Sequence, residues 1–106
     1  MSGKLSGTCE QARKAAKKYD GKVKVLDSLN VAIGERILVE YAVRLRGEGK
    51  GLNETYNSLE EKKKKIRLLA LLDTLKYLRK GGRISAIKCI SGELLNIKPV
   101  ISLHGG

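Results

Sequence analysis

A glycine pair followed by an arginine, Gly81-Gly82-Arg83, is the stretch of this sequence best suited to binding chemistry. Glycines allow positive φ and let the backbone approach a ligand closely. Arg83 would supply a planar fork of donors that fits a carboxylate or a phosphate, and the amides after Ser85 would add a helix N-terminus. The stretch therefore predicts an anion site. The same spacing also occurs where Gly81 merely closes a helix and the arginine is solvated.

Hydroxyl-bearing and small residues also gather at the start of the chain, in Met1–Thr8. Thr8 and Gln11 fit a capping box, in which the hydroxyl bonds forward and the amide reaches back. The hydroxyls and free amides ahead of this helix could hold an anion. They could equally serve as a helix cap and nothing more.

The sequence offers no arrangement of residues typical of an enzyme. No paired carboxylates, no nucleophile with a base and no metal-binding pattern appear, and the only histidine, His104, stands in a glycine-flanked tail. Cys9 and Cys89 lie far apart without CxxC spacing, which disfavours zinc and favours reduced thiols. We therefore predict a protein that is not an enzyme and has no metal and no cofactor.

Composition indicates a small domain with an aliphatic core. The 106 residues are 42% hydrophobic but include no Phe and no Trp. The formal net charge of +11 should attract polyanions through a salt-sensitive field. The run Lys62–Lys65 is typical of a solvated helix face, because no stacking aromatic side chains accompany it.

Nothing in the sequence indicates export or membrane insertion. The N-terminus lacks the apolar region of a signal peptide. The longest apolar run, Leu68–Leu72, is far too short to span a bilayer. We expect a cytoplasmic protein.

Hydrophobic periodicity predicts an α/β fold, a small sheet with helices packed on it, forming a single compact unit over residues 1–106. The continuous apolar strand predicted at 68–73 is of the kind buried on both faces of a sheet. Pro99 suggests an edge position for the last strand. The full expectation is of helices at 8–19, 29–46, 53–67, 74–80 and 85–95, and of strands at 22–27, 68–73 and 98–103.

Several motifs of this chain, in this order and spacing, resemble those of the bacterial DegV family. They are Leu5-Ser6-Gly7-Thr8, Val25-Leu26-Asp27-Ser28, the stretch from Leu72 to Ile84, and the stretch from Leu94 to Ile101. The likeness runs almost from end to end. It implies that residues 1–106 correspond to the middle portion of a two-domain fold, from the end of the first domain to the start of the second.

Members of that family are fatty-acid-binding proteins, and several serve as the acyl-carrying subunit of a bacterial fatty-acid kinase. The resemblance implies a long-chain fatty acid in an apolar tunnel, with its carboxylate held by hydroxyls and presented to the kinase partner for phosphorylation. The positions that the resemblance places at the carboxylate are Ser2, Ser6, Thr8 and Arg83.

This chain also departs from the family pattern. Gly3 replaces one of two serines usual before Leu5, and Cys9 replaces an aromatic residue after Thr8. Two other functions therefore stay open: a structural segment of the fold without a ligand, and a basic protein that binds polyanions or nucleic acid. Aliphatic surface left uncovered would favour a homodimer.

Overall fold

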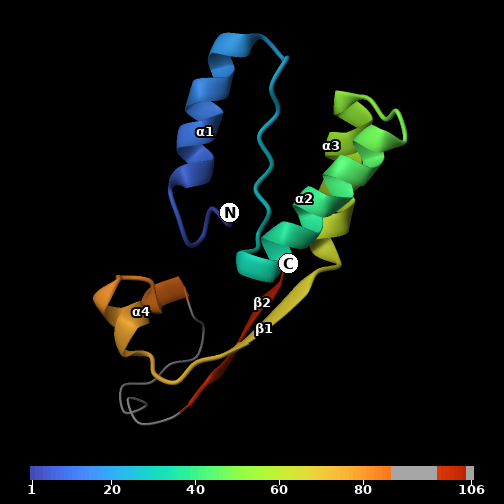
Figure 1. The fold of residues 1–106 in the computed structure, drawn as a ribbon. Helices are drawn as coiled ribbons and strands as arrows, with labels where there is room; N and C mark the ends of the chain where they lie inside the picture. Colours follow the sequence, from blue (N-terminus) through green and yellow to red (C-terminus); the bar gives the residue numbers. More distant parts are fainter. Residues whose placement is uncertain (87–97, 105–106) are drawn as a thin grey trace. The chain divides into compact units, whose positions relative to one another are not determined.

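The computed structural model describes residues 1–86 and 98–104. Its contacts group the chain into two units, one formed mainly by Met1–Leu68 and the other by Leu69–Leu103. Each unit is described by itself. Along the chain the elements are α1 (Thr8–Ala16), η1 (Lys17–Tyr19), α2 (Ala32–Gly47), α3 (Leu52–Lys64), β1 (Arg67–Leu71), α4 (Lys76–Lys80), η2 (Ile84–Ala86) and β2 (Val100–His104) (Figure 1).

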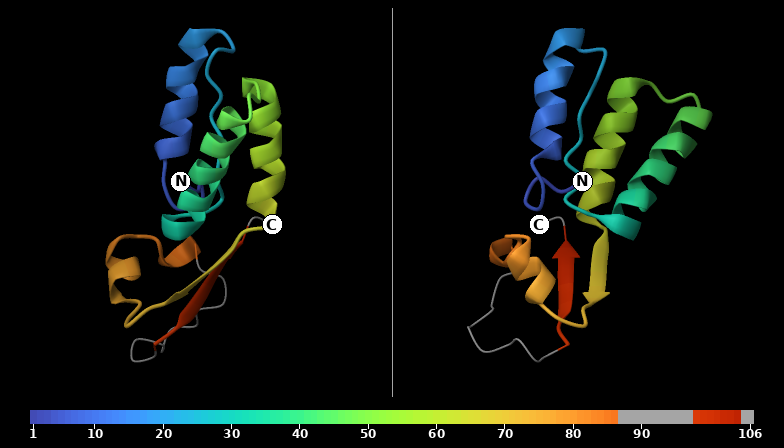
Figure 2. Two further views of the ribbon diagram at one scale, coloured as in Figure 1. Left: turned by 45° about the vertical axis from the view of Figure 1, so that its right-hand side comes forward. Right: turned by 60° about the vertical axis from the view of Figure 1, so that its left-hand side comes forward.

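The first unit contains α1, an extended segment that runs back alongside it, and a hairpin formed by α2 and α3 (Figures 1 and 2). Gly49 provides a positive φ of 80° in the turn between the two hairpin helices. Leu38 and Leu45, one heptad apart on α2, are buried, as is Ile66 after α3. These aliphatic side chains supply the core of the unit, as the composition predicts.

The start of α1 differs from the prediction. No side-chain hydrogen bond caps the helix, and Gly7 rather than Thr8 is its N-cap. The predicted capping box is therefore wrong: Thr8 is already helical, and its N–H donates to the Ser6 hydroxyl over 3.2 Å. Cys9 is the buried residue of α1, whereas Tyr19, in the turn of helix after it, is 56% exposed.

The strand predicted at 22–27 is not formed. The segment is extended, but no described residue hydrogen-bonds to the backbone of Val23–Leu26. Alternating side chains favour an extended backbone, whereas a strand also needs a partner for its N–H and C=O groups. The alternating pattern of residues 22–27 predicts the extended backbone but does not provide a pairing partner.

Helices α2 and α3 confirm the two long helices predicted in the first unit, with shifted ends. The first begins at Ala32 instead of residue 29, because Leu29 and Ala32 have positive φ values of 53° and 48°. The second begins at Leu52 with Gly51 as its N-cap, so the predicted Asn53 cap is not used. Both changes concern turn geometry that a helical period does not encode.

Most of the sheet belongs to the second unit, and in this sheet β1 and β2 are antiparallel neighbours (Figure 2). The Leu72 N–H donates to the Pro99 carbonyl over 2.9 Å, which sets the register and pairs Leu71 with Val100. Leu69 and Leu71 are 70% and 69% exposed. The prediction of a strand buried on both faces is therefore wrong for the described chain.

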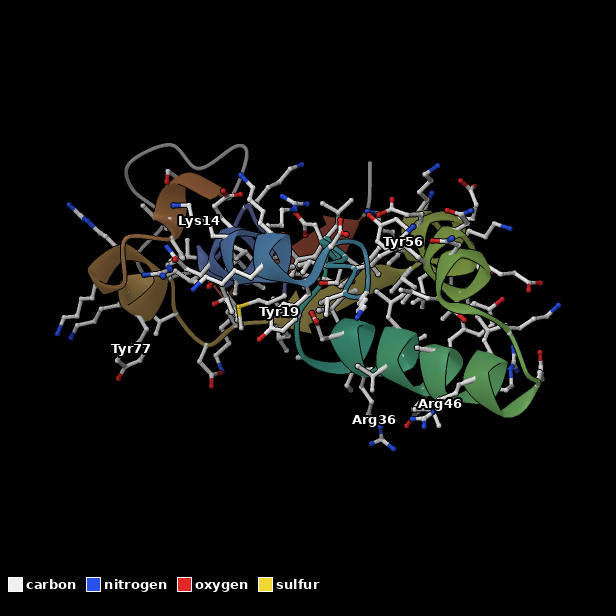
Figure 3. The ribbon with its side chains drawn as sticks, turned by 90° about the horizontal axis from the view of Figure 1, so that it is seen from above. Lys14, Tyr19, Arg36, Arg46, Tyr56 and Tyr77 are labelled. Atoms are coloured by element: carbon white, nitrogen blue, oxygen red, sulfur yellow. The ribbon has the colours of Figure 1, made fainter. Side chains whose placement is uncertain are left out.

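Helix α4 follows the sheet and confirms the short helix predicted there. Leu75, just before it, is a buried apolar residue of the unit. Of the helix predicted at 85–95, the structure describes a single turn, Ile84–Ala86, and the remainder lies outside the described residues. Polar side chains face outward, as Figure 3 shows for Arg36 on α2.

Helices accompanied by a small sheet are the fold class that the sequence predicts.

Candidate functional site

The predicted hydroxyls lie in one tight loop, Ser2–Thr8, which we call the serine loop. The carbonyl of Ser2 accepts the N–H groups of Leu5 and Ser6, each over 3.1 Å, and this closes the loop. The Ser6 and Thr8 hydroxyl oxygens are 2.7 Å apart. One hydroxyl of the pair donates to the other, so the second retains a proton for another acceptor. The structure thus brings Ser6 and Thr8 together.

Ser2 is the buried member of the loop, with 3% of its surface exposed. Its N–H donates to the Asn30 carbonyl over 2.9 Å, and its hydroxyl accepts the Lys4 N–H over 3.3 Å. Within the described part of the chain, nothing accepts the proton of this hydroxyl. A carboxylate could take that proton in a short hydrogen bond.

A second loop, Asp27–Asn30, holds the serine loop in place, and we call it the Asp27 turn. Asp27 Oδ1 accepts the N–H of Gly3 from the serine loop and the N–H of Leu29 from its own turn, both over 3.0 Å. The Ser28 hydroxyl lies 2.7 Å from a carboxylate oxygen of Glu35 on α2. Positive φ at Leu29 makes this turn costly for a residue with a side chain. Such backbone strain is typical of functional sites.

Asn30 is completely buried at the end of this turn. Its Nδ2 donates to the Ser28 carbonyl over 3.2 Å, while its Oδ1 has no hydrogen-bond partner among the described residues. A Cβ at Gly34 would collide with this Oδ1. Glycine is therefore required where α2 approaches the turn, although the sequence presents Gly34 only as a weak point of the helix.

Lys63 reaches the Asp27 turn from α3. Its Nζ donates to the Asp27 carbonyl over 3.0 Å and lies 2.7 Å from Glu60 Oε2. Only 8% of Lys63 is exposed, which contradicts the prediction that the whole lysine run is solvated. The helical period could have predicted this burial, because Lys63 follows the apolar Leu59 by one turn and so lies on the same helix face.

Asp27 is held in its charged form. Partial burial, the largest cause, would raise the pKa of this carboxyl, but the hydrogen bonds from the Leu29 and Gly3 amides and the charges of Lys63 and Arg13 together outweigh it. The net effect is a pKa below the usual value. The Asp27 turn is thus an anionic acceptor for backbone amides.

Arg83, the predicted cation of the site, belongs to the second unit. Its N–H donates to the Leu78 carbonyl over 2.9 Å, and its Nη1 donates to the Gly81 carbonyl over 2.7 Å. Gly82 has a φ of 71°, so the glycine pair ends α4 in a turn that presents the arginine. Its place at the carboxylate stays a prediction.

The remaining chemistry of the described chain is sparse. Over residues 1–86 and 98–104, no three His, Cys, Asp or Glu side chains converge as metal ligands would. No helix in the same residues is long and apolar enough to cross a bilayer. The polar contacts of the serine loop and the Asp27 turn are therefore the strongest candidate for a site.

Comparison with known proteins identifies the relatives of this chain. A family model described as "Uncharacterised protein, DegV family" matches residues 1–106. A DegV domain-containing protein of Deinococcus radiodurans is 38% identical over 106 residues, and one of Staphylococcus aureus is 35% identical over the same length. The chain is covered completely in both cases and spans 38% of the length of each relative.

Solved structures give the same result. The chain resembles a DegV family protein from Thermus thermophilus, in a structure described as showing fatty acid binding, with a TM-score of 0.81 and 36% identity. It also resembles a DegV family protein from Ruminococcus gnavus, described with vaccenic acid, with a TM-score of 0.80 and 25% identity. Each match covers 97% of this chain and 37% or 38% of the other. This chain belongs to the DegV family.

Proposed function

We propose that this chain binds a fatty acid and that the serine loop holds the carboxylate. The observation that carries the proposal is the likeness to the Thermus thermophilus protein, at 36% identity and a TM-score of 0.81, because that structure is described as binding fatty acid. The Ruminococcus gnavus structure, described with vaccenic acid, supports the same ligand class.

The chemistry of the serine loop agrees with an acyl head group. A carboxylate is best held by short hydrogen bonds from hydroxyls. Ser2 has a hydroxyl proton that no described residue accepts, and the pair Ser6 and Thr8 shares one hydrogen bond between two hydroxyls. We propose Arg83, in the second unit, as a further carboxylate-binding residue, because a guanidinium can bind a carboxylate with two parallel bonds.

We also propose that the bound acid is a substrate for a partner. A carboxylate held by hydroxyls at the surface of a carrier could attack the terminal phosphorus of a nucleoside triphosphate bound to a kinase subunit, which would form an acyl phosphate and release the nucleoside diphosphate. In this proposal the chain is a carrier, and the catalyst is another polypeptide.

Native mass spectrometry of the protein as purified, followed by titration with vaccenic acid, tests the proposal. We expect one fatty acid per chain or per assembly. Ser2→Ala should weaken vaccenic acid binding by about 10- to 150-fold, because one hydrogen bond to a charged group contributes roughly 1.5–3 kcal/mol. Ser102→Ala, at an exposed position on β2, is the matched control and should change nothing.

The opposite result is equally clear. An empty protein that also fails to take up vaccenic acid would refute the proposed function. Binding to a short nucleic acid that falls steeply with added salt would then favour the polyanion alternative, because the net charge is +11.

A further inference from the structure

We propose that Asp27 is a positioning residue for the fatty-acid carboxylate, acting through the Gly3 amide to hold the Ser2 hydroxyl in place. This inference rests on the proposed function. It assigns a role to a residue that does not itself touch the ligand, and it links the Asp27 turn to head-group recognition.

The Asp27 turn holds successive amides of the serine loop. The Ser2 N–H donates to the Asn30 carbonyl over 2.9 Å, and the next N–H, that of Gly3, donates to Asp27 Oδ1 over 3.0 Å. The peptide units on both sides of the Ser2 side chain are therefore fixed by the same turn. A serine whose backbone is fixed in this way presents its hydroxyl in one direction, which lowers the entropy cost of binding.

Asp27 is itself fixed well enough to serve as an anchor. Its Oδ1 also accepts the Leu29 N–H over 3.0 Å, and its carbonyl accepts Nζ of the buried Lys63 over 3.0 Å. The Asp27 carboxylate is thus held by an amide of its own turn. The Asp27 backbone is held by Lys63 of α3. A surface aspartate with a mobile side chain would lack these restraints.

Gly3 fits this arrangement in a way that a larger residue would not. A Cβ at position 3 would lie 2.6 Å from Asp27 Oδ2. The carboxylate could not rotate away without losing the Gly3 or the Leu29 amide. The family resemblance leads us to expect serine at position 3, where this chain has glycine. The Asp27 contact therefore depends on the absence of a side chain at Gly3.

The test compares vaccenic acid with the primary alcohol of the same chain, because only the acid carries a charged head group. Asp27→Ala should weaken binding of the acid about tenfold and leave binding of the alcohol within about twofold, since the tail contacts are unchanged. Asp27→Asn should retain most of the acid affinity, because its amide oxygen can accept the same N–H groups. Glu61→Ala, at an exposed carboxylate on α3, is the control.

A second pair of variants tests the contact between Gly3 and Asp27 by changing the glycine instead of the aspartate. Gly3→Ala should also lower the affinity for the acid, because its Cβ displaces the Asp27 carboxylate. Gly47→Ala, at the end of α2 and outside the serine loop, is the matched control, since a Cβ there meets nothing within 4 Å. This pair tests the inference even if Asp27→Ala fails to fold.

The possible results separate the two proposals. If the unaltered chain binds the acid but Asp27→Ala and Gly3→Ala leave the acid-to-alcohol affinity ratio unchanged, the inference is overturned and the proposed function stands. An equal loss for acid and alcohol would likewise overturn it, since that pattern indicates general damage. If the unaltered chain binds neither compound, both proposals are refuted.

Discussion

Among single residues, Asp27 combines partial burial with hydrogen bonds from backbone amides, and this makes its charge part of the stability of the fold. Its pKa is lowered in the folded chain, because the Leu29 and Gly3 amides together with the charges of Lys63 and Arg13 outweigh the effect of burial. A carboxyl with a lowered folded pKa stabilises the folded state above its unfolded pKa of about 3.9. That stabilisation is lost as the pH falls through the lowered folded value.

Asp27→Asn should therefore remove part of the loss of folding stability that the unaltered chain shows at acid pH. We expect the difference in unfolding free energy between the unaltered chain and this variant to be constant near neutral pH and to shrink below about pH 4. Urea unfolding at stepped pH values measures it. A difference that does not change with pH down to 3 would show that the charge of Asp27 does not contribute.

The site residues differ in how far the sequence revealed them. Ser2, Ser6 and Thr8 became candidates through the hydroxyls near a helix start and through the family resemblance, and the structure places them in one loop. Lys63 was missed because a run of lysines hides which member faces inward. The Gly3 amide contact could not be predicted, since it joins residues 24 positions apart.

Among the helices and strands, those whose signal is local were predicted best. Helices α2 and α3 follow their apolar period, and their ends shift where turns intervene. The strand predicted at 22–27 was wrong because pairing depends on another segment. The burial predicted for β1 was wrong for the same reason, since an apolar run does not specify what covers it.

Helix α3 should depend on its inward lysine. Lys63→Met should lower the unfolding free energy by about 1–3 kcal/mol, because the Asp27 carbonyl loses its donor and Glu60 loses its partner. Lys64→Met, next in sequence but exposed and paired only with the exposed Glu61, should change it by less than about 0.5 kcal/mol. Urea unfolding monitored by circular dichroism provides both values, and equal effects would contradict the assignment.

For the whole molecule, the exposed face of the sheet is the feature with the clearest consequence. Leu69, Leu71 and Val100 are each at least 65% exposed on a sheet of two strands. Apolar side chains clustered on one face favour association. The homodimer expected from the sequence stays a prediction, and this face is where we expect it to form.

Light scattering coupled to size exclusion tests that expectation over a range of protein concentrations. The double variant Leu71→Thr, Val100→Thr should shift the mass toward the monomer, because threonine keeps strand propensity while removing apolar surface. Val39→Thr, Val43→Thr removes exposed valines of α2 and should leave the mass unchanged. A monomeric unaltered chain at high concentration would contradict the prediction.

The contacts of the Asp27 turn also affect the order of folding. Gly3 and Lys63 bond to Asp27 across 24 and 36 residues, so both contacts require closure of long loops. The entropy of loop closure must be overcome before such contacts stabilise anything, whereas the α2 and α3 hairpin forms from neighbours in sequence. We therefore expect the serine loop to become ordered after the hairpin that supplies Lys63. A ligand that needs the ordered loop selects molecules in which the first unit has already folded.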